Sequence, residues 1–497
     1  MVTIIAQNCI GLDFKILYDD FCLLQYGIVL DCGSSRTTVY VYRWPADKEN
    51  NTGVVSETHV CNVNGSGISD WSNMTLNKLG KCMKEVEEHI PSSQHKTTPV
   101  YLGATAGMRL LHLQNESASN EILLNLKNYL KTLPFQFKNV SIISGEEEGL
   151  YGWITVNYLM NNFLERNLWN AWVRPHAAQT VGSLDLGGAS TQIAFATPDD
   201  EAGEGQTQIT LYGYKYNVYT HSYLCYGKNE AEKAVLANLV QMSKDKRNVL
   251  NPCYPSGYNT TKRAKSIFGS NCTKNPTNYD PEQIIALFGT GNVLRCREAV
   301  RSIFDLQSSC ENCSFNGVHQ PPVSGKFKAY AGFFYTSDAL NLTATSSLDQ
   351  FNRTIWDFCS LDHKSLLQTK LQKKHLHSYC YSANYIYTLL KDGYKFNADT
   401  WQDIDFQSKV NNTSIAWTLG YMLALSNMIP AEAKFLLPMK NDVFAGLLFL
   451  FSALTIVALI TLLIILGWSN KFDHANVKRF VSEETELNIF QSELHKL

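Results

Sequence analysis

The sequence lacks any strong imbalance of charge. Lys and Arg together number 43 against 45 Asp and Glu, and the formal net charge is -2. Such a balance provides no basic surface for nucleic acid and no polybasic tail. Disorder is excluded as well, because 45% of the residues are hydrophobic. At 497 residues the chain is too long for one compact core, so we expect two domains.

Several familiar motifs are also missing. The chain contains no Walker A motif and no kinase lysine set, so neither of those ways of holding phosphate applies. The cysteine spacing of a zinc site is missing too, because no second pair of cysteines at zinc-site spacing accompanies Cys310-x-x-Cys313. These absences exclude the P-loop, kinase and zinc-finger designs.

The cysteines and glycosylation sequons favour an oxidising compartment. Ten of the 13 cysteines form an even set in the middle of the chain, which is typical of disulfides; reduced structural cysteines are the alternative. About a dozen Asn-x-Ser/Thr sequons occur, and none follows residue 413. The ten cysteines are Cys61, Cys82, Cys225, Cys253, Cys272, Cys296, Cys310, Cys313, Cys359 and Cys380, and the sequons include Asn64, Asn73, Asn115, Asn259, Asn341 and Asn352.

One segment is apolar enough to cross a membrane. Residues 443–468 carry no charge and are long enough to span a bilayer with some tilt. Basic residues flank the segment in nearly equal number, so they do not orient it.

The first 24 residues have neither a clean signal-peptide core nor a membrane span, because charged residues interrupt short apolar pieces. Either the true start differs from this one, or the chain is anchored by its tail with its globular part in the cytosol. The cysteines and sequons favour the first reading.

The first half of the chain alternates extended apolar runs with helical patterns, which indicates an α/β fold. We expect strands over residues 26–31, 37–44, 100–103, 140–143, 184–185 and 191–195. Helices are expected over residues 106–113, after Ser144, and over residues 414–425. Residues 200–410 hold most of the cysteines and show no clear period.

One short pattern occurs twice. Asp31-Cys32-Gly33-Ser34-Ser35 and Asp185-Leu186-Gly187-Gly188-Ala189-Ser190 each follow an apolar strand and precede a second one. Each copy ends a strand with a carboxylate and continues with residues small enough to let backbone N–H groups approach a phosphate. One copy alone would be an ordinary glycine-turn hairpin. Two copies predict a pair of turns that hold a polyphosphate between them.

These residue types fit the hydrolysis of a phosphoanhydride, which needs neutralised charge, donors around the phosphates and a base that orients water. Asp31 and Asp185 suit a hard cation such as Mg²⁺ or Ca²⁺. Ser34, Ser35, Ser190 and the glycines suit phosphate oxygens. Thr105-Ala106-Gly107 offers another phosphate-binding turn at an expected strand-to-helix junction.

A candidate base lies in Ser144-Gly145-Glu146-Glu147-Glu148-Gly149. Ser144 with Glu147 three residues later is a capping box, and acidic residues favour the first turn of a helix. By these local rules alone, all three glutamates are capping residues. Only a family resemblance singles out Glu148.

Six segments together carry a family resemblance: YGIVLDCGSSRTTVYVYRWPADKENNTG, LGATAGMRLL, SGEEEGLYGWITVNYL, DLGGASTQIAF, SFNGVHQPP and AWTLGYMLALSNMIPAE. As a set they resemble the ectonucleoside triphosphate diphosphohydrolases, the ecto-apyrases of the actin and heat-shock-ATPase superfold. The resemblance runs from about Tyr26 through the membrane segment and is best to the cell-surface, two-span branch.

The resemblance implies two RNase H-like domains with the active site in the cleft between them, and a C-terminal transmembrane helix. Domain I would comprise residues 26–144 and 408–440, and domain II residues 145–407. Residues 1–25 would be an atypical N-terminal segment and residues 469–497 a cytoplasmic tail. The implied disulfides are Cys61–Cys82, Cys225–Cys272, Cys253–Cys296, Cys310–Cys313 and Cys359–Cys380.

For the site, the resemblance implies that Glu148 activates water, helped by Ser190 and Gln192, without a phosphoenzyme. Asp31 and Asp185 would hold Ca²⁺ or Mg²⁺ largely through water, with Trp417 supporting the metal region. The implied phosphate-binding residues are Ser34, Ser35, Thr105, Ala106, Gly187, Gly188 and Ala189. Tyr335 and Tyr394 match positions that sandwich the base, with core packing as the alternative; stacking on tyrosine would tolerate many bases.

The implied activity is the stepwise hydrolysis of nucleoside tri- and diphosphates to monophosphates at the plasma membrane, outside the cell. Membrane lipid and further copies of the chain are the implied partners. Two other classes of function stay open. An adhesion or receptor ectodomain without catalysis is opposed by the intact site residues. An intracellular chaperone-like or sugar-kinase-like ATPase is opposed by the cysteines and sequons.

Three features depart from the family pattern. Cys32 stands where the family usually has Ala. We expect activity to survive this change, while a free thiol beside the site predicts sensitivity to oxidation. Glu146 replaces a usual Gln and would raise the pKa of Glu148 if both side chains face the cleft. The N-terminal membrane helix typical of this branch is missing from the first 24 residues.

Overall fold

The computed structural model describes residues 24–46, 52–63, 65, 67–70, 73–167, 172–175, 179–198, 204–307, 310, 312–342, 346–426, 445–468 and 481. By internal contacts the chain divides into two units, Met1–Glu432 and Ala433–Leu497. The expected N-terminal segment (except its last two residues) and cytoplasmic tail (except Val481) lie outside the described residues.

The first sheet has the strand order β3-β2-β1-β4-β5. β1 (Leu24–Cys32), β2 (Thr37–Pro45) and β3 (Ser56–Val63) form an antiparallel meander, while β4 (Pro99–Ala104) and β5 (Gln136–Ile142) run parallel to β1. The apolar run of β1 is buried on both faces, as expected of a central strand. Ile28 and Leu30 face one hydrophobic cluster and Val29 faces another.

The second sheet repeats this arrangement and adds one strand, in the order β10-β11-β9-β8-β15-β16. Here β11, β9 and β8 form the antiparallel meander, while β15 and β16 run parallel to β8. The strands are β8 (Gly182–Leu186), β9 (Ser190–Ala196), β10 (Gln206–Leu211), β11 (Tyr214–Leu224), β15 (Phe327–Ala331) and β16 (Ile404–Phe406). Asp31 and Asp185 therefore occupy equivalent places at the end of β1 and of β8. The repeated sequence pattern corresponds to a repeated fold, and the predicted strand pairs are confirmed.

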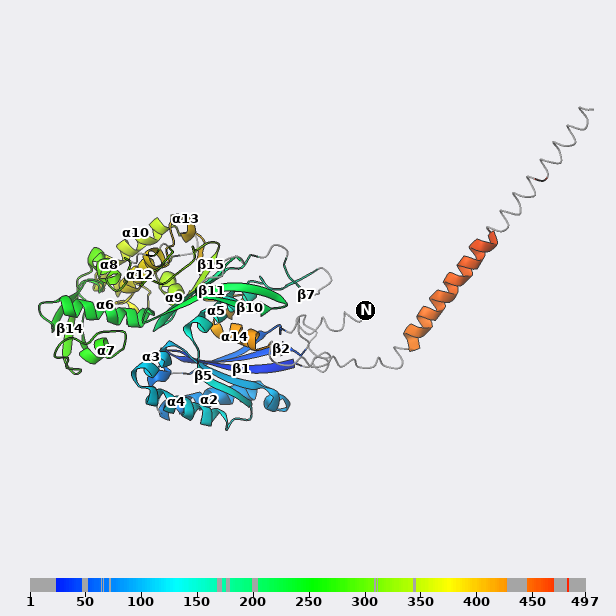
Figure 1. Ribbon diagram of the computed structural model, residues 1–497, viewed down its shortest axis with the longest axis horizontal. Helices are drawn as coiled ribbons and strands as arrows, with labels where there is room; N and C mark the ends of the chain where they lie inside the picture. Colours follow the sequence, from blue (N-terminus) through cyan, green and yellow to red (C-terminus); the bar gives the residue numbers. More distant parts are fainter. Residues whose placement is uncertain are drawn as a thin grey trace, which may run out of the picture. The chain divides into compact units, whose positions relative to one another are not determined.

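Helices cover the outer face of each sheet (Figure 1). The first sheet carries α2 (Asn73–His89), α3 (Ala106–Gln114) and α4 (Glu116–Leu130). The second sheet carries α8 (Val293–Arg301), α9 (Gly332–Ala339), α10 (Leu348–Cys359) and α12 (Tyr379–Thr388). Beside them, α6 (Lys228–Met242), α7 (Ala264–Phe268) and a small sheet of β12 (Asn248–Asn251), β14 (Ile284–Gly289) and β13 (Asn259–Arg263) share a separate core.

Two helices, α5 (Gly145–Leu159) and α14 (Trp417–Ser426), lie between the sheets and pack on each other (Figure 1). The Thr155 hydroxyl donates to the Ala416 carbonyl at 2.7 Å and accepts from the Gly420 N–H at 2.8 Å. One hydrophobic cluster contains residues of both sheets, such as Val29 and Val218. The two halves of the fold thus share a continuous core around these helices.

The expected helix over residues 414–425 begins later, at Trp417. Thr413–Ser414 instead forms strand β18, which pairs with β17 (Lys409–Val410) in a short hairpin. The spacing of apolar residues does not predict this hairpin, because its two short strands form by pairing with each other and not through a periodic apolar face.

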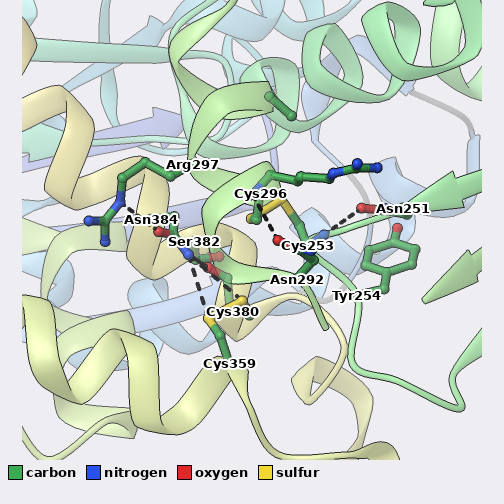
Figure 2. The surroundings of a disulfide bond; sticks show 12 residues. Asn251, Cys253, Tyr254, Asn292, Cys296, Arg297, Cys359, Cys380, Ser382 and Asn384 are labelled. Atoms are coloured by element: carbon green, nitrogen blue, oxygen red, sulfur yellow. Dashed lines mark hydrogen bonds between the residues drawn. A yellow bond between two sulfur atoms is a disulfide. The ribbon is translucent and has the colours of Figure 1, made fainter. Parts of the chain in front are cut away.

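All five implied disulfides are present. Two of them brace the outer helices, because Cys253–Cys296 ties the end of β12 to α8 and Cys359–Cys380 ties α10 to α12 (Figure 2). Between them, the Arg297 guanidinium donates to the side-chain amide oxygen of Asn384 at 3.1 Å. Such cross-links stabilise a cysteine-rich region mainly by restricting its unfolded state.

The helix Ala445–Trp468 is the one helix among the described residues that is long and apolar enough to cross a membrane. Its mean hydropathy over the apolar window is 2.9. The hydroxyls of Thr455 and Thr461 donate to backbone carbonyls one turn earlier, at 2.9 and 3.1 Å, so these polar groups are satisfied within the helix. The first two residues of the expected span lie outside the described residues.

The contact between α5 and α14 leaves no room for a side chain at Gly420. A Cβ there would lie 2.0 Å from the Tyr151 carbonyl oxygen. We expect Gly420→Ala to lower the free energy of unfolding by about 1–3 kcal/mol, because the helices must separate. Thermal unfolding followed by circular dichroism measures this loss.

Gly80→Ala in α2 is the matched control, because its nearest neighbour would be the Tyr129 hydroxyl at 3.6 Å. This change should raise stability by about 0.5–1 kcal/mol through higher helix propensity. Equal effects of the two substitutions would contradict the close packing.

Candidate active site

The turns over residues 31–35 and 185–190, the first and second aspartate turns, contain equivalent hydrogen bonds and lie against each other. The Gly33 N–H donates to the Arg36 carbonyl at 2.9 Å, and the Gly187 N–H donates to the Ser190 carbonyl at 3.0 Å. A Cβ on Gly188 would lie 2.5 Å from Ser35 Oγ and 2.7 Å from Ser34 Oγ. The structure thus brings together the glycines and serines that the sequence assigned to phosphate.

The turn Thr105-Ala106-Gly107 packs on the first aspartate turn. The Thr105 N–H donates to the Cys32 carbonyl at 3.1 Å, and a Cβ on Gly107 would lie 2.9 Å from the Ser34 Cα. Ala106 is the first residue of α3, where backbone N–H groups have no partner inside the helix. All three predicted phosphate-binding turns therefore meet at one place, with a helix N-terminus that favours anions.

A buried network surrounds Glu148. Arg109 forms an ion pair with the Glu148 carboxylate, and Gln192 Nε2 donates to the same oxygen at 3.1 Å. Gln192 Nε2 also lies 2.7 Å from Ser190 Oγ and 2.9 Å from Ser222 Oγ. Ser190 and Gln192 extend from β9, Ser222 from β11 and Arg109 from α3. The predicted trio of Glu148, Ser190 and Gln192 is thus in direct contact.

The capping interpretation holds for one of the three glutamates. The Ser144 hydroxyl accepts from the Glu147 N–H at 3.0 Å, and the Glu147 carboxylate accepts from the Ser144 N–H at 2.9 Å. Glu148 is one residue further around α5 and points inward. Glu146 is exposed. Local rules therefore describe Glu147 correctly, but they do not predict that Glu148 is buried.

Burial controls the ionisation of the carboxyl groups. It raises the pKa of Glu148 to about 7; the Arg109 charge acts against this shift and the Asp31 charge adds to it. It also raises the pKa of Asp31 to about 6 and that of Asp185 well above its usual range. The expected effect of Glu146 on Glu148 is not found, because Glu146 faces solvent and the shift follows from burial and Asp31.

The residues present fit a divalent cation bound largely through water. Asp31 and Asp185 both stay partly exposed and repel each other electrostatically. No cluster of three or more acidic, His or Cys side chains suited to a metal occurs among the described residues, so the protein offers two carboxylates and not a closed cage. Trp417 lies beside Asp31 and acts to lower the pKa of that carboxyl. Among the described residues, Gln192 Oε1 is buried here without a hydrogen-bond partner and suits ordered water.

The two tyrosines predicted to sandwich the base have different surroundings. Tyr335 on α9 is 55% exposed and its ring is available for stacking. Tyr394 is 0% exposed and lies in the core of the second sheet, so the prediction that it stacks on the base is wrong. Its hydroxyl lies 3.1 Å from Thr191 Oγ1, which donates to the Asp185 carbonyl at 2.7 Å. Tyr394 therefore supports the second aspartate turn from the core side, through Thr191.

Three site residues escaped the sequence analysis. Arg109 lies in LGATAGMRLL, one helical turn after Ala106, and that spacing could have identified it as facing the same site. Ser222 and Asn229 carry no local signal. Asn229 Nδ2 donates to Ser35 Oγ at 3.3 Å and so connects the second half of the fold to the first aspartate turn.

Comparisons with known proteins identify the family of this chain. The family model of the GDA1/CD39 (nucleoside phosphatase) family matches residues 23–438. The chain belongs to this family. Human ectonucleoside triphosphate diphosphohydrolase 3 is 51% identical over 91% of this chain and 89% of its own. Chicken ectonucleoside triphosphate diphosphohydrolase 8 is 42% identical over 90% of this chain and 92% of its own length.

The fold also has a solved counterpart. A structure of nucleoside triphosphate hydrolases from Neospora caninum covers 82% of this chain and 93% of its own with a TM-score of 0.56. The identity is 16%, so this likeness concerns the fold alone. The α/β fold of paired sheets predicted from the sequence is confirmed.

The contact with Arg109 predicts a shift in pH dependence. Arg109→Met removes the cation that lowers the pKa of Glu148, so the carboxylate takes up its proton at a higher pH. Because a base works only when deprotonated, the acid limb of the rate profile should move upward by about one pH unit. Rates of nucleotide hydrolysis between about pH 5.5 and 9.5 measure this shift. Arg109→Lys, which keeps the charge, should move the limb less; an unmoved limb in Arg109→Met would contradict this reading.

The environment of Cys32 overturns the expected sensitivity to oxidation. The side chain is 0% exposed, and burial together with the Asp31 charge raises the pKa of its thiol. A buried neutral thiol is a poor nucleophile. We expect iodoacetamide to leave the activity of the folded protein unchanged, and Cys32→Ala to keep activity within about twofold. Rapid inactivation that Cys32→Ala prevents would disprove this.

Proposed function

We propose that this protein hydrolyses nucleoside tri- and diphosphates to monophosphates and phosphate outside the cell. The observation that carries the proposal is the buried Glu148 carboxylate, with a pKa of about 7, near three glycine-containing turns that meet at one place. A base whose pKa lies near the working pH is the most effective one. Family membership supports the same chemistry.

In the proposed step, a water oxygen forms a bond to the terminal phosphorus while the bond from that phosphorus to the bridging oxygen breaks. The shortened nucleotide leaves with the bridging oxygen, and Glu148 accepts the proton from water. Ser190 and the free Oε1 of Gln192 lie where they can hold this water. Arg109 holds the carboxylate in place. In this proposal Glu148 acts as a base on water and, as the family resemblance implies, no phosphoenzyme forms.

Asp31 and Asp185 would hold a divalent cation, Ca²⁺ or Mg²⁺, largely through water, with Trp417 beside them. When bound, this cation neutralises negative charge on the phosphates. Phosphate oxygens would accept hydrogen bonds from backbone N–H groups and hydroxyls of the three turns. These are formed by Ser34, Ser35, Thr105, Ala106, Gly187, Gly188 and Ala189. The exposed ring of Tyr335 would stack on the base.

In this proposal residues 26–144 with 408–440 form one domain and residues 145–407 the other, with substrate held in a cleft between them. The apolar helix would anchor the protein in the plasma membrane, where it contacts lipid and self-associates. The five disulfides support an extracellular position for the catalytic domain, since such bonds persist in oxidising compartments.

The test is phosphate release from ATP and ADP added to intact cells that express the chain, with Ca²⁺ or Mg²⁺ present or chelated. We expect metal-dependent release that Glu148→Gln lowers by about 10³-fold or more, because the base is lost. Glu146→Gln is the matched control: the same change two residues away on an exposed side chain should leave activity within about twofold.

Each outcome has a definite meaning. Activity that appears only after lysis would overturn the extracellular position. Equal losses in both variants would overturn the role of Glu148. No hydrolysis by folded protein in either setting would refute the enzyme and leave a catalytically inactive ectodomain.

A further inference from the structure

An exposed apolar patch lies on the small sheet of β12, β14 and β13. Leu250, Ile284 and Phe288 are 63%, 53% and 36% exposed. Strand β14 alternates, so Ile285 and Leu287 fill the core beneath while Ile284 and Phe288 face outward. Leu250 on β12 pairs in register with Phe288. Exposed apolar strands of this kind favour unwanted association.

A glycosylation sequon lies on the same face of this sheet. Asn259, in Asn259-Thr260-Thr261, is the antiparallel partner of Phe288 on the edge strand β13. Side chains of directly opposed residues point to the same face, with Cβ atoms about 5 Å apart. Asn259 is exposed in the structure. An edge strand is also where a bulky polar group prevents pairing with another chain.

We propose that Asn259 carries an N-linked glycan whose first N-acetylglucosamine covers Phe288 and Leu250. The Asn259 amide nitrogen forms a bond to C1 of this sugar while the bond from C1 to the phosphate oxygen of a lipid-linked oligosaccharide donor breaks. The lipid diphosphate leaves with that oxygen, and the proton lost from the amide nitrogen passes to solvent. One face of the sugar ring presents C–H groups, which suit the electron-rich face of Phe288. This inference rests on the extracellular position in the proposed function, because the donor acts on exported chains.

Asn139 provides an internal control in the same chain. It too begins a sequon, Asn139-Val140-Ser141, and is exposed on a strand at the edge of its sheet, β5. Its partner across the sheet, Tyr101, is only 8% exposed. A glycan at Asn139 would therefore find no exposed aromatic face at the position where Asn259 has Phe288.

The experiment uses the full chain expressed in mammalian cells. Glycopeptide mass spectrometry measures occupancy at each sequon, and N-glycosidase digestion of the folded protein measures how fast each glycan is released. We expect slow release at Asn259 and faster release at Asn139. Phe288→Ala should accelerate release at Asn259 several-fold and leave Asn139 unchanged.

Stability provides a second readout. Thr261→Ala removes the sequon while keeping Asn259, and we expect it to lower Tm by about 2–4 °C. Thr261→Ser keeps the sequon and should have no such effect. If the glycan acts through Phe288, Thr261→Ala should cause little further loss in a Phe288→Ala background, because coupled residues are not additive.

The outcomes separate this inference from the proposed function. Glycans on other sequons but none at Asn259 would overturn the inference alone. Release rates or Tm losses that do not depend on Phe288 would overturn the covering contact. Absence of glycan from every sequon would overturn the extracellular position together with this inference, whereas hydrolysis by lysed cells would show that the enzyme survives.

Discussion

The ion pair between Arg109 and Glu148 is the contact on which the site depends. It joins α3, which packs on the first sheet, to α5, which packs on the second. Burying both charges is costly, and such pairs rarely add net stability. Here the pair fixes the position of the Glu148 carboxylate, because the same guanidinium also lies 3.3 Å from Ser190 Oγ and 3.4 Å from Ser222 Oγ. Residues from both halves of the fold thus hold the Glu148 carboxylate at once.

Small residues then determine how close the two halves come. Two turns with equivalent hydrogen bonds approach so closely that Gly188 has no space for a Cβ beside Ser34 and Ser35. Backbone N–H groups on opposite sides can therefore point at one chain of phosphates. The duplicated sheet topology explains why the turns are equivalent, since each follows the central strand of its sheet. Tyr394 and Thr191 hold the second turn from within the core.

The parts of the structure that follow local rules could be read from the sequence. The paired aspartate turns and the Ser144–Glu147 cap depend on neighbours along the chain, and the structure contains both. The disulfide pairs followed from the family resemblance and not from spacing. What failed depends on tertiary surroundings: Tyr394 is an ordinary tyrosine until its strand and helix partners bury it, and Cys32 is a reactive thiol only if solvent reaches it. Arg109 was missed because its partner is 39 residues away.

The charges at the site support the cation that the proposed mechanism places between the two aspartates. Burial raises the pKa of Asp31, Asp185 and Glu148, and repulsion from neighbouring carboxylates adds to the shifts of Glu148 and Asp185. Arg36 and Arg109 offset part of this repulsion, yet three carboxylates still face two guanidinium groups. A polyphosphate brings further negative charge to the same place, so without added positive charge it would be repelled and the carboxylates would hold their protons. A divalent cation between the two aspartates would keep Asp31 and Asp185 ionised, lower the pKa of the base and allow the anionic substrate to approach. In the proposed mechanism, metal dependence and general-base catalysis would both follow from this one set of neighbouring acids.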